Sequence, residues 1–246
     1  KVGEVWVAGG VYNEPRDNGG TLSMLAGVDL YGGFAGGENT RDARDSATHE
    51  TVIDGSVADG GLPAARVLNG ANDAVLDGFT IRGGRGATGA GMLNFNVSPT
   101  IRHCLFTDNV AGDYGGALFN IGTSTPVIAD CTFNKNSAGK SGGAVSNLQS
   151  SPFFQRCTFS NNSSDTGGAI LNNLSAGLFQ DCVFVSNTAT GGGGAFSRFS
   201  SRSRLCSTRA TASASGCCCA GTPWRMRPSV VRGGGALLIG VPFVGS

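Results

Sequence analysis

The chain has 246 residues, of which 41 are glycine and only 14% are charged, and its net charge is +1. A near-zero net charge gives no support for nucleic-acid binding. The glycines lack the strict three-residue period of collagen, so we expect them to serve turns. The longest apolar run, Ala236 to Val244, has nine residues, whereas a membrane-spanning helix needs about 20. These properties predict no nucleic-acid partner and no transmembrane segment in this chain.

Short runs rich in β-branched and aromatic residues recur along the chain and are bounded by Gly, Asn and Asp, a pattern typical of strands separated by turns. They begin 23–27 residues apart, at Val5, Val28, Val52, Val75, Ile101, Ile128, Phe154 and Phe179. A repeat of this length indicates a solenoid or array. No helical 3.6-residue pattern lies between the runs, which argues against alternating strands and helices.

Two further motifs repeat in the middle of the chain. Gly-Gly-Ala-Leu-Phe-Asn at 115–120 returns in similar form at 142–147 and 167–172. A Cys-x-Phe-x-x-Asn motif occurs four times, and its successive cysteines are 27, 26 and 25 residues apart. Such a period fits one coil of three short strands, each hydrogen-bonded to its equivalent about 4.8 Å away in the next coil. Right-handed crossing is the default for parallel connections. The sequence therefore predicts an all-β protein, a right-handed parallel β-helix of about eight coils with three short strands per coil, over residues 1–199.

Side-chain alternation along the strands predicts stacked interior columns. We expect the thiols to be buried and free, because stacked cysteines have parallel Cβ vectors that do not suit the disulfide torsion; disulfides or a metal are the alternative. We expect the asparagines to bond local backbone and each other. The predicted structural columns are Phe79, Phe106, Phe133, Phe159 and Phe184; Cys104, Cys131, Cys157 and Cys182; Asn94, Asn120, Asn147 and Asn172; and Asn109, Asn136, Asn162 and Asn187.

The alternating Gly-Gly-Ala-(Ile, Leu or Val) and Phe-x-x-Asn motifs resemble the repeats of the chlamydial polymorphic outer-membrane proteins. More widely, the chain is similar to bacterial right-handed β-helix repeat proteins of the pectate-lyase-like fold, and segments 5–12, 30–36 and 52–55 look like the opening coils of that group. The resemblance covers about residues 1–199. It implies a non-enzymatic, adhesive or structural protein that is secreted or on the cell surface, at the bacterial outer membrane or outside it. Because the fold also hosts enzymes, the alternative is a polysaccharide lyase or glycoside hydrolase.

If the protein were an enzyme, we would expect its catalytic residues among the charged side chains at equivalent positions of neighbouring coils. The residues that precede the column cysteines are His103, Asp130, Arg156 and Asp181, which should point outward on consecutive coils. Lyases of this fold use Ca²⁺-bound acids with a basic Arg or Lys, and its hydrolases use clustered Asp residues. The other interpretation is an alternating charge ladder on a solvated face. No catalytic residue is therefore assigned, although these four are the candidates.

Cofactors, metals and partners are predicted from the same patterns. No multi-acid loop typical of calcium sites accompanies the charged column, so we expect no cofactor or metal, with Ca²⁺ required only under the lyase alternative. Asp54 and Asp77 each follow two apolar residues and precede Gly, and we expect them to close a corner through hydrogen bonds to local backbone. The alternative is that they stack on neighbouring coils and bind a cation. Expected partners are polysaccharides or cell-surface ligands, together with end-to-end self-association through open strand edges at the C-terminal end.

The repeat fails after Ala195, and Arg198 stands where the pattern predicts Asn. Residues 182–246 contain seven arginines and no acid, whereas residues 1–181 contain 11 basic and 17 acidic residues. We predict an irregular basic tail over residues 200–246, with a weak trace of the repeat at 234–238. A disordered segment and an out-of-frame product are both consistent with this composition.

Overall fold

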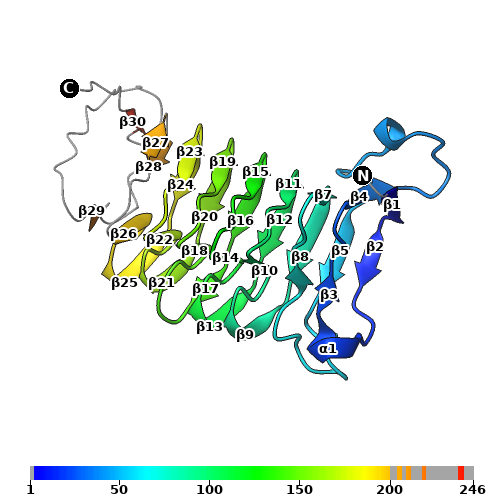
Figure 1. The fold of residues 1–246 in the computed structure, drawn as a ribbon, viewed down its shortest axis with the longest axis horizontal. Helices are drawn as coiled ribbons and strands as arrows, with labels where there is room; N and C mark the ends of the chain where they lie inside the picture. Colours follow the sequence, from blue (N-terminus) through cyan, green and yellow to red (C-terminus); the bar gives the residue numbers. More distant parts are fainter. Residues whose placement is uncertain (1–2, 200–203, 207–208, 212–217, 220–237, 241–246) are drawn as a thin grey trace.

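The computed structural model describes residues 3–199, 204–206, 209–211, 218–219 and 238–240. The chain winds through about eight coils of a right-handed β-solenoid, with almost no helix (Figure 1). Strands from successive coils stack side by side along the long axis, and the N-terminal coil lies at the opposite end from strands β26 and β27. The predicted parallel β-helix is confirmed.

Three long sheets form the walls of the solenoid, with parallel pairing at every step except between β28 and β30. Sheet A consists of β1 (Gly3–Ala8), β4 (Val28–Phe34), β7 (Val75–Asp77), β11 (Thr100–Arg102), β15 (Val127–Ala129), β19 (Phe153–Gln155), β23 (Leu178–Gln180) and β27 (Arg204–Cys206). Sheet B consists of β2 (Gly10–Tyr12), β5 (Thr51–Asp54), β8 (Phe79–Arg82), β12 (Leu105–Thr107), β16 (Thr132–Asn134), β20 (Thr158–Ser160), β24 (Val183–Val185), β28 (Arg209–Thr211) and β30 (Leu238–Gly240). Sheet C consists of β3 (Leu22–Ser23), β6 (Leu68–Asn69), β10 (Met92–Phe95), β14 (Leu118–Ile121), β18 (Val145–Leu148), β22 (Ile170–Asn173), β26 (Phe196–Phe199) and β29 (Cys218–Cys219).

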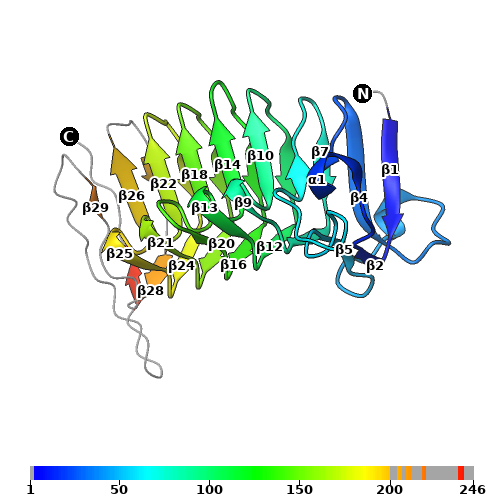
Figure 2. The ribbon, with the colours of Figure 1, turned by 90° about the horizontal axis from the view of Figure 1, so that it is seen from below.

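A fourth, shorter sheet adds to the three that the sequence predicts. Sheet D lies between sheets B and C in the chain and is present in five coils only (Figure 2). Its strands are β9 (Arg85–Thr88), β13 (Val110–Tyr114), β17 (Ser137–Ala138), β21 (Ser163–Thr166) and β25 (Thr188–Gly192). Among the described residues, two short helical segments, α1 (Asp17–Gly20) and η1 (Arg41–Ala43), lie in the N-terminal coils.

Each corner of a regular coil is made by one residue in the left-handed region, which turns the chain sharply between two strands. This conformation is unfavourable for L-residues because of their Cβ atom, but it is not strained for glycine. One corner column is glycine throughout, at 89, 115, 142, 167 and 193, which explains the repeated Gly-Gly-Ala motif. The other corners hold either glycine or a residue whose side chain lies on the outside of the coil. They are Gly78, His103, Asp130, Arg156 and Asp181 between sheets A and B; Gly83, Asp108, Lys135, Asn161 and Ser186 after sheet B; and Asn96, Gly122, Gln149 and Leu174 after sheet C.

The N-terminal coils correct two register predictions. Val52 pairs with Thr80 in sheet B, not with a strand of sheet A, because Leu30 of the second coil pairs directly with Leu76. The second coil is therefore nearly twice the regular length and contains two insertions, residues 35–50 and 55–66. Phe79 does not align with Phe106, whose partner is Ile81. Phe79 is buried, but it occupies the position at which the later coils have cysteine.

Aromatic rings fill the interior of the regular coils. Phe133 stacks on Phe106 and Phe159 with ring centroids 5.1 and 4.8 Å apart, and Phe159 stacks on Phe184 at 4.9 Å. These separations match the distance between hydrogen-bonded strands, so each ring covers its neighbour in the next coil. The column thiols Cys104, Cys131, Cys157 and Cys182 are buried and free, and each donates to the carbonyl two residues earlier at 3.1–3.4 Å. Burial raises the pKa of the Cys131 thiol well above its ordinary value.

Buried asparagines form two hydrogen-bonded ladders. In the first, the Nδ2 of Asn94 donates to Asn120 Oδ1 at 2.8 Å, and the chain of amides continues through Asn147 to Asn172. In the second, Asn109, Asn136, Asn162 and Asn187 are joined in the same way at 2.9–3.1 Å. Here each Nδ2 also donates to a carbonyl of the preceding coil, and each of the last three Oδ1 atoms also accepts a backbone N–H. A repeated neutral amide is thus satisfied by its own copies.

The parallel pairing continues past residue 199, since β27 pairs with β23 and β28 pairs with β24. The boundary between a β-helix over 1–199 and an irregular tail over 200–246 stays a prediction. Most of that tail, including residues 234–237 of the proposed repeat trace, lies outside the described residues.

Candidate functional site

The four charged candidates occupy the corner column between sheets A and B. His103, Asp130, Arg156 and Asp181 all have left-handed backbone conformations, with φ between 48° and 54°. This conformation directs their side chains away from the core, while the cysteine that follows each of them is buried. The column is therefore a feature of corner geometry.

Within this column, Arg156 and Asp130 neutralise each other. The guanidinium Nε and Nη2 donate to Oδ1 and Oδ2 of Asp130 at 2.7 and 2.6 Å. The hydrogen bonds from Arg156 lower the pKa of Asp130, and the same contact raises the pKa of Arg156. Asp181 adds a further negative charge near the guanidinium. An arginine held in this way is not available as a catalytic base.

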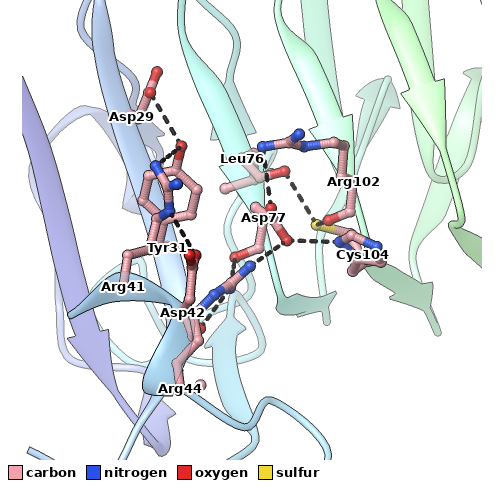
Figure 3. A network of polar contacts seen from close by, with 12 residues as sticks. Asp29, Tyr31, Arg41, Asp42, Arg44, Leu76, Asp77, Arg102 and Cys104 are labelled. Carbon is pink, nitrogen blue, oxygen red and sulfur yellow. Dashed lines mark hydrogen bonds and ion pairs between the residues drawn. The ribbon is translucent and has the colours of Figure 1, made fainter. Parts of the chain in front are cut away.

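His103 is directed to a different partner, the buried carboxylate of Asp77, which Figure 3 shows beside Arg44 and Arg102. Its Nδ1 lies 2.9 Å from Asp77 Oδ1, which also accepts from Arg44 Nη2 at 2.8 Å. The other oxygen, Oδ2, lies 3.3 Å from Arg102 Nη2. The side chain of Asp77 is 4% exposed, and a buried charge needs this kind of pairing. We call these four residues the Asp77 cluster.

The sequence-based expectation for Asp54 and Asp77 holds for one of them. Asp54 accepts a hydrogen bond from the backbone N–H of Ser56 at 2.8 Å and pairs with Arg82 at 2.9 Å, so it closes a local turn as expected. Asp77 instead binds side chains from the insertion and from the next coil. The two carboxylates do not stack, since Asp54 aligns with Arg82 in sheet B and Asp77 with Arg102 in sheet A.

The insertion at residues 35–50 is fixed on the outside of sheet A. Arg44 donates to the carbonyls of Gly32 and Asp77 at 2.8 and 3.1 Å. The guanidinium carbons of Arg41 and Arg44 lie 5.0 and 5.2 Å from the centre of the Tyr31 ring, a cation–π arrangement. Tyr31 in turn donates to Asp29 Oδ2 at 3.2 Å (Figure 3). The insertion therefore has a defined position relative to the corner column.

A shallow pocket of about 280 Å³ lies between this insertion and sheet B. Glu50 belongs to its rim, and Glu50 Oε1 accepts a hydrogen bond from the Thr80 hydroxyl at 2.7 Å. Of the four sequence candidates, only His103 lines it. The lining residues are Ser46, Ala47, Glu50, Gly78, Phe79, Thr80, His103 and Leu105.

Sequence reasoning missed Glu50, Thr80 and the central role of Asp77. The length of the polar loop before β5 was the available signal for a pocket, but nothing in the sequence placed that loop beside His103. In the described part of the chain, no group of three or more His, Cys, Asp or Glu side chains is arranged to hold a metal ion. None of the helices described is long and apolar enough to cross a membrane.

Comparison with known proteins identifies the family. No significant match was found among curated proteins or among solved structures. Residues 44–219 match the family model described as "Right handed beta helix region". The match spans most of the chain and agrees with the stacked parallel sheets, so this chain belongs to the family of right-handed β-helix proteins.

Proposed function

We propose that this protein is a non-enzymatic, secreted or cell-surface β-helix protein with an adhesive or structural role. The observation that carries the proposal is the state of the charged column. Arg156 and Asp130 form a bidentate pair on an exposed corner, and His103 is bound to Asp77. Acids and bases that already satisfy one another on a solvated corner suit a stable surface better than bond cleavage.

The outer face of sheet B supports a binding role. Thr132, Asn134, Thr158 and Ser160 are half-buried and form polar rows, because Thr132 pairs with Thr158 and Asn134 with Ser160. A repeated row of hydroxyl and amide groups on a rigid sheet is suited to an extended, repetitive ligand such as a polysaccharide. The similarity of the repeats to those of polymorphic outer-membrane proteins supports the proposed location.

The test uses the full chain, a panel of neutral and acidic polysaccharides, and samples with and without Ca²⁺. We expect co-sedimentation with an insoluble polysaccharide or a cell-envelope fraction, and no release of reducing ends or unsaturated products. Thr158→Arg should weaken co-sedimentation, whereas Thr125→Arg, outside sheet B, should not. Cleavage abolished by Asp130→Ala, Arg156→Ala or His103→Ala would overturn the proposal.

A polysaccharide lyase or hydrolase is the second candidate, and the pocket beside His103 is the observation that favours it. A histidine whose Nδ1 is held by a carboxylate has its other ring nitrogen free to exchange a proton with a substrate. Under this alternative, His103→Ala would abolish cleavage, whereas the ion-paired Arg156 would be dispensable.

We also propose end-to-end association. The C-terminal end, for which the sequence predicts it, lies largely outside the described residues, but the N-terminal coil also presents strand edges. Strands β1, β2 and β3 are the outermost strands of sheets A, B and C there. Val5, Trp6 and Val11 on these strands are exposed, and unpaired edges of this kind favour pairing with another chain. Sedimentation velocity of the wild type and of Val11→Lys would test it: we expect concentration-dependent assembly that the substitution reduces.

A further inference from the structure

Four buried thiols form a column inside the solenoid and take no part in the functions proposed above. Cys104, Cys131, Cys157 and Cys182 are at most 2% exposed and occupy equivalent positions in four successive coils. Phe79 holds the same position in the coil before them and is also buried. The position therefore accepts a large apolar side chain, so packing alone does not require sulfur in four coils.

The thiols interact with backbone carbonyls and with one another. Each Sγ lies 3.5–3.8 Å from a carbonyl oxygen of the preceding coil, in addition to its shorter contact with the carbonyl two residues earlier. Hydrogen bonds from Cys131 and Cys182 lower the pKa of the Cys157 thiol, which lies between them. A thiolate in the column is thus stabilised by the S–H groups on either side of it, and the thiolate is the form that binds metals.

The spacing of the column matches a metal–sulfur bond. Each thiol makes the same contact within its own coil, so the sulfur atoms repeat at the strand spacing of about 4.8 Å. Half of this spacing, about 2.4 Å, is close to the length of a zinc–thiolate bond, about 2.3 Å. An ion midway between two sulfur atoms would therefore reach both of them without movement of the backbone. A disulfide would instead require the two sulfurs to approach to about 2 Å.

The number of ligands selects the metal. Among the described residues, no three His, Cys, Asp or Glu side chains are grouped to hold one ion, so the column does not offer the four ligands of a structural zinc site. Soft thiolate ligands favour Cu(I), a monovalent ion that binds two sulfurs in a line. Each Cu(I) that enters displaces one thiol proton without electron transfer, so the charge of the core does not change, as a buried site requires.

We propose that this column binds three Cu(I) ions, each bridging the cysteines of two neighbouring coils. The three gaps between four sulfurs hold three ions and three thiolates, and the fourth thiol keeps its proton. Ions that join successive coils should stabilise the folded state, because they bind it and not the unfolded chain. The inference goes beyond the proposed surface role and does not depend on it.

The experiment is an anaerobic titration of the full chain with Cu(I) delivered from a chromophoric chelator, with native mass spectrometry to count the bound ions. The cysteines outside the column are first replaced in every sample, by Cys206→Ser, Cys217→Ser, Cys218→Ser and Cys219→Ser. Because the column is buried, Cu(I) is added both to the folded protein and during refolding from denaturant. We expect three ions per chain in at least one of these conditions, one proton released per ion and a higher melting temperature.

Two results of this titration would overturn the proposal. One is failure of the protein to retain Cu(I) from the chelator in both conditions. The other is equal retention of Zn²⁺ in a parallel titration, because it would show that the site is not a linear one.

Single substitutions distinguish a bridged column from independent thiols. Cys104→Ser, at the end of the column, removes one gap and should leave two ions. Cys131→Ser, in the interior, removes two gaps and should leave one ion, and Cys157→Ser is a second interior variant with the same expected result. Thr132→Ser, on the outer face beside Cys131, is the control and should keep three ions. Equal losses in the end and interior variants, with wild-type thermal unfolding, would mean that the thiols bind ions independently and would refute the inference.

Discussion

The coils before residue 100 and those from 100 to 199 bury polar groups in different ways. Among the described residues, the buried carboxylates are Asp29, Asp54 and Asp77, all in the N-terminal coils. The later coils bury Asn and Ser side chains instead, in columns that repeat with the coil. The two regions share one fold but not one means of stabilisation.

The difference follows from repetition. A buried amide in a regular coil finds an identical amide about one strand spacing away, so donors and acceptors match without any charge. The insertion at residues 35–50 has no copy in the next coil. Its attachment relies on arginines that bind a carboxylate, backbone carbonyls and an aromatic ring. An insertion in a repeat protein therefore needs interactions with particular non-equivalent residues, whereas a regular coil is stabilised by the equivalent residues of the next coil.

The largest expected effect tests the regular core. Phe133→Ala removes a ring that stacks on both sides and contacts Phe154 edge-on at 6.3 Å. We expect the free energy of unfolding to fall by about 3–5 kcal/mol, measured by denaturant unfolding. Thr132→Ala, its outward neighbour on β16, should change stability by less than about 0.5 kcal/mol. A loss below about 1 kcal/mol for Phe133→Ala would contradict the inward stacking.

The Asp77 cluster tests the irregular region. Asp77→Ala removes the common partner of Arg44, Arg102 and His103, and breaking a buried ion pair in this way should cost about 3 kcal/mol. Because Arg44 anchors the insertion, trypsin should also cleave faster after Arg41 and Arg44. The exposed corner residue Asp108 provides the control, and Asp108→Asn, which removes the charge but keeps a residue that tolerates the left-handed conformation, should leave both stability and proteolysis unchanged. Equal cleavage rates in the two variants would contradict the anchoring role.

A single amide tests the neutral ladder. Asn136→Ala removes one of the two acceptors of the Asn109 side-chain amide, the side-chain acceptor of the Asn109 backbone N–H, and one donor to Asn162 Oδ1. We expect a loss of about 2 kcal/mol, measured by thermal and denaturant unfolding. Asn134, two residues earlier, is half-buried and faces outward, so Asn134→Ala should have a much smaller effect. Similar losses for the two variants would mean that the ladder adds nothing.

Replacement of one corner residue should increase the stability of the protein. Leu174 is exposed and has φ of 50°, a conformation that costs an L-residue about 1–2 kcal/mol. After the entropic cost of glycine, about 0.5–1 kcal/mol, Leu174→Gly should stabilise the protein by about 0.5 kcal/mol. The reverse change in the same column, Gly122→Leu, should destabilise it, because an added Cβ would collide with the Asn96 side chain. Destabilisation by Leu174→Gly would show that the corner conformation is not limiting.

The smallest effect belongs to the exposed pair of Asp130 and Arg156. Arg156 lowers the pKa of Asp130, so the pair stabilises the fold above the unfolded-state pKa of about 3.9. This contribution disappears as the pH falls through the lower, folded-state pKa. Unfolding curves of wild type and Arg156→Ala should therefore differ slightly at pH 6 and converge near pH 2. A difference that persists at pH 2 would show that Arg156 acts through packing.

The sequence predicts the solenoid well because equivalent positions in successive coils hold the same type of residue, so the coil length is visible as a repeat. Phe106, Phe133 and Phe159 repeat at the coil spacing, and so do the cysteines and asparagines that frame them. Spacing was misleading only in the N-terminal coils, where Val52 lies at a regular interval by coincidence and belongs to sheet B. Sheet D was missed because strands such as Ser137–Ala138 and Ser163–Thr166 consist of residues typical of turns.

The candidate site was less predictable for a different reason. His103 was identified from its place in a column, but its partner Asp77 comes from the preceding coil and Arg44 from an insertion. Contacts between non-equivalent positions leave no periodic signal. The pocket depends on where the insertion folds, which one sequence does not reveal.

The asparagine ladders give the solenoid a net dipole along its axis. Every hydrogen bond between neighbouring asparagines in the two columns runs from the Nδ2 of the residue in the N-terminal coil to the Oδ1 of the residue in the next coil. The amide dipoles therefore add along the axis, with the negative end at the N-terminal coils, where Asn94 Oδ1 is buried without a hydrogen-bond partner. Aligned hydrogen bonds polarise one another in a low-dielectric interior. Replacing two asparagines of one ladder should thus cost a different amount from the sum of the two single changes, however far apart their coils lie.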